Sequence, residues 1–120
     1  MLNLVLLSAL VGMVAGVIAA VCGVGGGIVM VPAFVMLLGL AQKEAVATSL
    51  TAIILISLLA TIKNHANSFV NWPVAISCAV VGALVAWFAA DLLKVLSNQT
   101  LTRIFAVLMI VVGVRMLFQK

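Results

Sequence analysis

The sequence predicts an all-α integral membrane protein, and three observations support this fold class. Hydrophobic residues make up 68% of the 120 residues and charged residues only 7%, whereas soluble domains carry about 25% charged residues. The mean hydropathy is +1.50. Apolar runs separated by short polar segments have the lengths of membrane helices and half-helices. Residues 1–120 are therefore expected to form a single transmembrane domain.

The first two apolar runs are expected to form a helical hairpin broken by glycine. Residues 4–40 would measure about 55 Å as one helix, longer than a hydrocarbon core of about 30 Å. The chain must therefore turn, and Gly23, Gly25, Gly26 and Gly27 mark the place. The second arm holds only 13 residues, which favours a half-helix that re-enters the membrane, although a hairpin that crosses fully is left open.

Three longer apolar runs follow, and each is expected to be a transmembrane helix: 46–62, 74–90 and 101–118. Trp72 and Trp87 lie near the two ends of the second of these runs, as interfacial tryptophans do. Asp91 is expected to pair with Lys94, three residues later. These three helices and the broken hairpin together make one repeat unit of a helix bundle.

Charge and residue types exclude several classes of function. The net charge is +4, but the Lys and Arg residues are spread along the chain and form no basic patch for nucleic acid. Neither acidic residue lies inside an apolar run, which argues against an exporter of hydrophobic cations. Paired carboxylates, metal-ligand clusters and nucleophile–base pairs are absent from the sequence, so no enzyme, metal or cofactor is expected.

The glycine segment is the first candidate binding site. Non-helical backbone at membrane depth is tolerated where it is buried in protein or lines a polar cavity. Free N–H groups at the start of the second arm, with the positive end of the helix dipole, favour an anion. We therefore predict that Gly23, Gly25, Gly26 and Gly27 bind substrate. The alternative is that these glycines only allow close helix packing.

Hydroxyl side chains in the third run are the second part of the predicted site. Thr48, Ser49 and Thr51 are expected to follow a short loop over residues 42–44, begin a helix and donate hydrogen bonds to the substrate. The alternative for Thr48 or Ser49 is an N-cap that satisfies the first helical turn. Three further residues are candidates: Cys22, Asn64 and His65.

Several motifs resemble those of one known family. They are the glycine segment followed by Val31-Pro32, residues 43–50, His65-Ala66-Asn67 before Val70-Asn71-Trp72, Gly82-Ala83, and residues 101–117. On these motifs the sequence resembles the sulfite exporter TauE/SafE family. The resemblance implies a multi-pass protein of the bacterial inner membrane that moves sulfite or a related sulfur-containing anion or organosulfonate. Small anion channel subunits and non-transporting membrane assembly subunits remain as alternatives.

Length is the main departure from this resemblance. Family members are about twice as long and look like two copies of one unit, whereas this sequence holds one unit without an internal repeat. The resemblance thus implies alternating access by a dimer, either with a second copy or with a sister half-transporter. The basic residues divide three against three, with Lys43, Lys94 and Arg103 opposite Lys63, Arg115 and Lys120. The sequence therefore predicts no orientation and leaves an antiparallel homodimer open.

Overall fold

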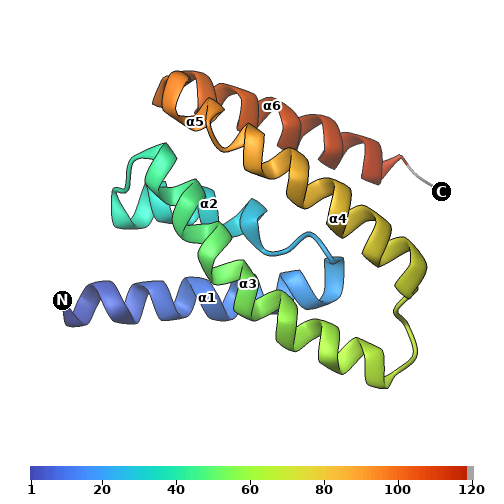
Figure 1. Cartoon of the computed structure of the whole chain (residues 1–120). Helices are drawn as coiled ribbons and strands as arrows, with labels where there is room; N and C mark the ends of the chain where they lie inside the picture. The colour runs from blue at the N-terminus through green and yellow to red at the C-terminus, as the bar shows by residue number, and fades with distance from the viewer. Residues whose placement is uncertain (119–120) are drawn as a thin grey trace.

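The computed structural model describes residues 1–118, so Lys120 lies outside the described range. Within that range the chain forms helices joined by short connections (Figure 1). The helices are α1 (Leu2–Cys22), α2 (Gly27–Leu38), α3 (Gln42–Ala66), α4 (Trp72–Ala89), α5 (Leu92–Val95) and α6 (Asn98–Leu117). Four apolar segments are long enough to span a membrane: Leu2–Cys22, Gln42–Ala66, Trp72–Val95 and Asn98–Leu117. The predicted fold class is confirmed.

The chain between α1 and α2 is not helical. α1 ends at Cys22, and Gly23 has φ 69° with its N–H donated to the Ala19 carbonyl at 3.0 Å. Gly25 and Gly26 also have positive φ, at 71° and 73°, in a region that glycine adopts without steric cost. The predicted glycine break is therefore confirmed, and it consists of left-handed backbone rather than a bent helix.

α2 is too short to cross a bilayer by itself. Its 12 residues measure about 18 Å at the rise of an α-helix. It ends at Gly39, which has φ 67°, and the Leu40 N–H returns to the Phe34 carbonyl at 3.2 Å. This glycine-terminated end turns the chain at once into α3. The N-terminus and the connection between α2 and α3 lie on the same side of the molecule (Figure 1).

α3 extends beyond the predicted run of residues 46–62 at both ends. It begins at Gln42 and ends at Ala66, so the predicted loop over residues 42–44 is wrong. Glu44 explains the early start, because its carboxylate accepts the N–H of Ala41 at 3.3 Å. Gln, Lys and Glu are good helix formers, and they carry the helix into the polar segment that the hydropathy pattern assigned to a loop.

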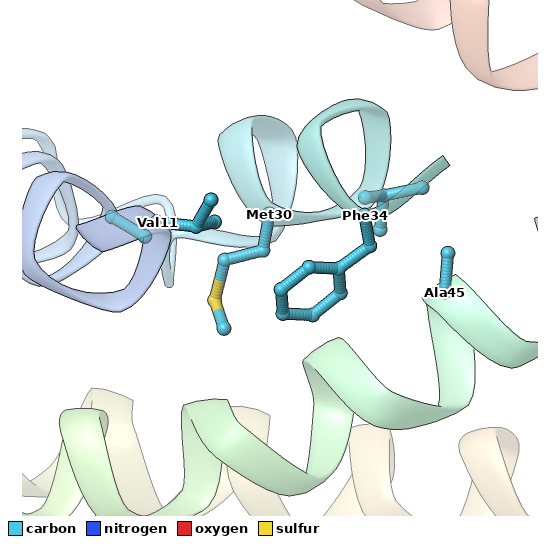
Figure 2. Close-up of a cluster of buried hydrophobic side chains, with 6 residues drawn as sticks. Val11, Met30, Phe34 and Ala45 are labelled. Carbon is cyan, nitrogen blue, oxygen red and sulfur yellow. The ribbon is translucent and has the colours of Figure 1, made fainter. Parts of the chain in front are cut away.

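A small apolar core holds α2 between α1 and α3. Figure 2 shows Val11 of α1, Met30 and Phe34 of α2, and Ala45 of α3 within one cluster. Ala15 of α1 belongs to the same cluster and is fully buried. Since these contacts fix α2 against two longer helices, they also fix the glycine segment from which α2 starts.

The remaining helices are open to their surroundings. α4 and α6 contain no buried residue, and Trp87 and Phe88 of α4 are 80% and 73% exposed. α4 packs mainly on α5, and α6 packs on α3. Outward-facing apolar side chains of this kind suit lipid or another membrane helix.

The beginnings of α3 and α6 meet on one side of the molecule. The Lys43 N–H donates to Asn98 Oδ1 at 3.3 Å, and Lys43 Nζ donates to the Lys94 carbonyl at 3.5 Å. These contacts place Lys43 and Lys94 at the same end of the molecule, and their side of the membrane stays a prediction. The predicted ion pair is also confirmed, with Lys94 Nζ 2.6 Å from Asp91 Oδ1.

Candidate functional site

The glycine segment presents backbone N–H groups that are not used by the fold. The Gly26 carbonyl accepts the N–H groups of Val29 and Met30 at 3.1 and 2.9 Å, which starts α2. Within residues 1–118, no backbone hydrogen bond outside the helices uses the N–H of Gly25, Gly26 or Gly27. Such groups carry the positive end of the helix dipole. Unused N–H donors of this kind can bind a hydrogen-bond acceptor, and they bind an anion most favourably.

Packing encloses the segment between α1 and α3. A Cβ on Gly26 would lie 3.0 Å from the Ala15 carbonyl oxygen, and a Cβ on Gly27 would lie 3.2 Å from Ile53 Cδ1. Gly23 differs, because no atom lies within 4 Å of its Cβ position and its N–H already donates to a carbonyl of α1. Gly23 therefore shapes the turn, whereas the other three glycines leave their N–H groups open.

An elongated cavity of about 330 Å³ leads away from the glycine segment. Its lining comes from α2, α3 and α6: Gly27, Ile28, Val31, Gln42, Val46, Ser49, Leu50, Ile53, Leu101, Ile104, Phe105 and Leu108. Since a water molecule occupies about 30 Å³ of the liquid, the cavity has room for a small solute. The residues that line it are apolar apart from Gln42, Ser49 and Gly27.

The three predicted hydroxyl residues lie on two different faces of α3. Ser49 is 2% exposed and lines the cavity together with Gly27. Thr48 and Thr51 share a face, as their spacing predicted, but they line a separate open pocket. The structure therefore brings Ser49 to the glycine segment and leaves both threonines on the outer surface of the described chain.

The hydroxyl hydrogens of this group are bonded within α3. Ser49 Oγ donates to the Val46 carbonyl at 2.8 Å, and Thr51 Oγ1 donates to the Ala47 carbonyl at 3.0 Å. Such bonds to preceding carbonyls are common for Ser and Thr in membrane helices. Because α3 begins at Gln42, the N-cap alternative for Thr48 and Ser49 is wrong.

The other candidates lie away from the cavity. Cys22 is exposed with a free thiol and lines a different pocket, between α1 and α6. Asn64 and His65 lie near the end of α3, where the Trp72 indole N–H donates to His65 Nδ1 at 3.1 Å. His65 is twelve residues beyond Ile53, or about 18 Å along the helix axis. The structure therefore keeps Asn64 and His65 away from the glycine segment, whereas Cys22 directly precedes that segment but lines a different pocket from Gly27.

Gln42 is a candidate that the sequence analysis missed. It is 5% exposed, lines the cavity and, within residues 1–118, makes no side-chain hydrogen bond. The hydropathy pattern placed it in a loop, where a polar side chain needs no explanation. The available signal was its spacing of seven residues from Ser49, which places both on one face if the helix starts early.

These features define a multi-pass α-helical membrane protein with a glycine-broken hairpin, a device that transporters use to build binding sites. Residues 3–120 match the family described as Sulfite exporter TauE/SafE, and the chain belongs to this family. The resemblance seen in the sequence is therefore confirmed.

Curated relatives carry names that agree with this family. The chain is 30% identical over 113 residues to the probable membrane transporter protein YunE of Bacillus subtilis, covering 91% of this chain and 40% of the relative. It is 28% identical over 123 residues to a probable membrane transporter protein of Haemophilus influenzae, covering 97% and 47%. A probable membrane transporter protein of Xylella fastidiosa is 26% identical over 113 residues, covering 92% and 43%.

The chain thus spans less than half the length of the curated relatives it matches. The search of solved structures gave no significant match. The family description and the relatives' names are those of membrane transporters and not of enzymes, in agreement with the expectation from sequence.

Proposed function

We propose that this chain is one half of a transporter for a small oxyanion, either sulfite or a related sulfur-containing anion such as an organosulfonate. The observation that carries the proposal is the set of unused N–H groups of Gly25, Gly26 and Gly27 at the start of α2. No acidic side chain lines the adjoining cavity, so no negative charge there opposes an anion. The family description, which names sulfite, supports the choice of substrate.

The magnitudes suit transport. A hydrogen bond to a charged group contributes about 1.5–3 kcal/mol, so three backbone N–H groups would supply roughly 5–9 kcal/mol. Part of this gain is offset by the translational and rotational freedom that the anion loses on binding, about 4 kcal/mol or more, so the net affinity is modest. We expect an anion held this weakly to be released readily, as a transport cycle requires, without a basic side chain in the cavity.

The working transporter is proposed to be a dimer of half-units that operates by alternating access in the bacterial inner membrane. The unburied apolar surface of α4 supports a second chain packed against it. Without such a chain, non-helical backbone near the glycine break would face lipid, which is costly. The second chain is either another copy of this one, which an antiparallel arrangement would allow, or a sister half.

Counterflow of labelled sulfite in proteoliposomes tests the function. We expect saturable exchange that unlabelled sulfite competes, whereas a channel subunit would conduct without a competed step and an assembly subunit would give no flux.

Gly27→Ala, which places a Cβ 3.2 Å from Ile53 Cδ1, is expected to weaken exchange about tenfold, a change of about 1.4 kcal/mol. Gly82→Ala is the matched control, because no atom lies near its Cβ position.

Exchange that is absent for sulfite and for every organosulfonate tested would refute the substrate class. Accessibility mapping of a C-terminal tag tests the arrangement of the two halves. Labelling from both sides of the membrane is expected for an antiparallel homodimer, and labelling from one side alone would exclude it in favour of a parallel or heteromeric assembly.

A further inference from the structure

Gln42 is a largely buried residue whose carboxamide makes no hydrogen bond within the described fold. It is 5% exposed, and none of the hydrogen bonds among residues 1–118 involves its side chain. It lines the cavity that leads to the glycine segment. No side-chain nitrogen or oxygen among the described residues is fully enclosed without a partner, so the amide atoms of Gln42 reach accessible space. Because Gln42 lines the cavity, its hydrogen-bonding groups are available to a molecule that enters there.

The surroundings of Gln42 favour an anion over a cation. Gln42 is the first residue of α3, and α6 begins beside it, since the Lys43 N–H donates to Asn98 Oδ1 at 3.3 Å. Two positive helix ends therefore converge there. Lys43 Nζ also lies at this end, 3.5 Å from the Lys94 carbonyl.

The two acidic residues near this end are both engaged. The Glu44 carboxylate accepts the Ala41 N–H at 3.3 Å, and Asp91 pairs with Lys94 at 2.6 Å. Their charge is thus partly offset by groups outside the cavity, and neither residue lines it. The carboxamide of Gln42 has two N–H donors that can turn toward a ligand.

Gln42 lies too far from the glycine segment to share one small anion with it. Gly27 adjoins Ile53, which is eleven residues after Gln42 and about 16 Å farther along α3. Ser49 lies between them on the same wall of the cavity. The cavity therefore has a donor group at each end and an apolar middle that Ser49 interrupts.

We propose that Gln42 forms an outer oxyanion subsite, at which its amide N–H group binds the anion before the anion reaches the N–H groups of the glycine segment. The subsite rests on the proposed transport function and adds a second binding position to it. Two weak sites in series suit permeation, because a solute that binds tightly at a single site leaves it slowly.

Two substitutions separate ligand binding from a structural role. Gln42→Met keeps the length of the side chain and removes its hydrogen-bonding groups, and Gln42→Glu keeps the shape and adds a negative charge. Gln99→Met and Gln99→Glu are matched controls, since Gln99 is exposed on α6. The purified full chain in lipid nanodiscs would be assayed by thermal unfolding with and without sulfite or methanesulfonate, and proteoliposomes by sulfite counterflow.

For Gln42→Met we expect an unfolding midpoint at or above that of the wild type without anion, because an apolar group replaces an amide that lacks a partner. The rate of sulfite exchange at subsaturating sulfite should fall at least tenfold, because the glycine segment remains but the entry subsite is lost, and Gln42→Glu should lower that rate further by repulsion. The Gln99 variants should stay within twofold of the wild type in both measurements.

A Gln42→Met variant with a lowered midpoint and an unchanged rate of sulfite exchange would overturn the subsite and assign Gln42 a structural role, for instance in contact with a second chain. Wild-type affinity and exchange in both Gln42 variants would also overturn it while leaving the proposed function intact. If the wild type itself neither binds nor exchanges any sulfur anion, the proposed function fails, and the subsite fails with it. If Gln42→Glu does not fold, the Met variant decides.

Discussion

Replacing Gly26 with Ala tests whether packing, and not only backbone conformation, requires glycine at the helix break. Gly26 has φ +73°, and a Cβ there would lie 3.0 Å from the carbonyl oxygen and 3.3 Å from the Cβ of Ala15. The left-handed backbone costs a non-glycine residue about 1–2 kcal/mol. Overpacking adds about 1–3 kcal/mol, because a helical carbonyl cannot rotate away. We therefore expect the free energy of unfolding to fall by about 2–5 kcal/mol.

Two matched substitutions isolate these terms. Gly23 has φ +69° but no atom within 4 Å of its Cβ position, so Gly23→Ala should lose only the backbone term of about 1–2 kcal/mol. Gly12 lies inside α1, with open space around it. Gly12→Ala should stabilise the protein by about 0.5–1 kcal/mol, the usual helical preference for alanine.

Unfolding of the three variants in detergent micelles, followed by far-ultraviolet circular dichroism, gives the comparison. The expected order of stability is Gly12→Ala, wild type, Gly23→Ala and Gly26→Ala. Equal losses for Gly23→Ala and Gly26→Ala would refute the reasoning, because they would mean that α1 does not approach the glycine break as closely as the structure indicates.

Three further predictions concern the packing and the helix ends. Phe34→Ala should lower the free energy of unfolding by about 3–5 kcal/mol, since Phe34 is 4% exposed. Phe88 is 73% exposed, so Phe88→Ala should lower it by under about 1 kcal/mol in monomeric micelles. A large loss for Phe88 there would contradict its open position. Ser97→Ala should lower the free energy of unfolding by about 1 kcal/mol, because Ser97 Oγ caps α6 by accepting a backbone N–H at 3.2 Å. Ser77→Ala loses only a bond to a preceding carbonyl and should lower it less. Equal losses for the two variants would argue against the cap. Asp91→Asn removes an exposed ion pair and should change the unfolding free energy by at most about 1 kcal/mol, so a greater loss would indicate a buried role.

Composition and the glycine segment were sufficient to predict the fold class and the helix break. Backbone polar groups in a membrane are satisfied only in helices or closed barrels, and continuous apolar runs of helix length favour helices. An apolar stretch of 37 residues cannot form one helix within a bilayer. The ion pair of Asp91 with Lys94 was equally predictable, because a spacing of three residues on one helical turn fixes it locally.

The ends of the helices were less predictable. A hydropathy pattern shows which residues lie in the bilayer, whereas a helix can continue beyond the bilayer into polar sequence. The start of α3 at Gln42 depends on the Glu44 carboxylate and on good helix formers in a polar segment. That early start moved Thr48 and Ser49 into the helix interior and excluded the N-cap alternative. It also made Gln42 part of a cavity wall rather than part of a loop.

The sequence by itself determined that the backbone leaves the helix at residues 23–26, because consecutive glycines combine low helix propensity with access to left-handed conformations. Only the tertiary structure decided which side chains share the site. Successive residues of a helix point about 100° apart, so the packing of α2 and α6 against α3 places Ser49 and Gln42 on the cavity and leaves Thr48 and Thr51 outside it. Which face of a helix is covered depends on contacts between segments far apart in the chain, and no local pattern specifies them.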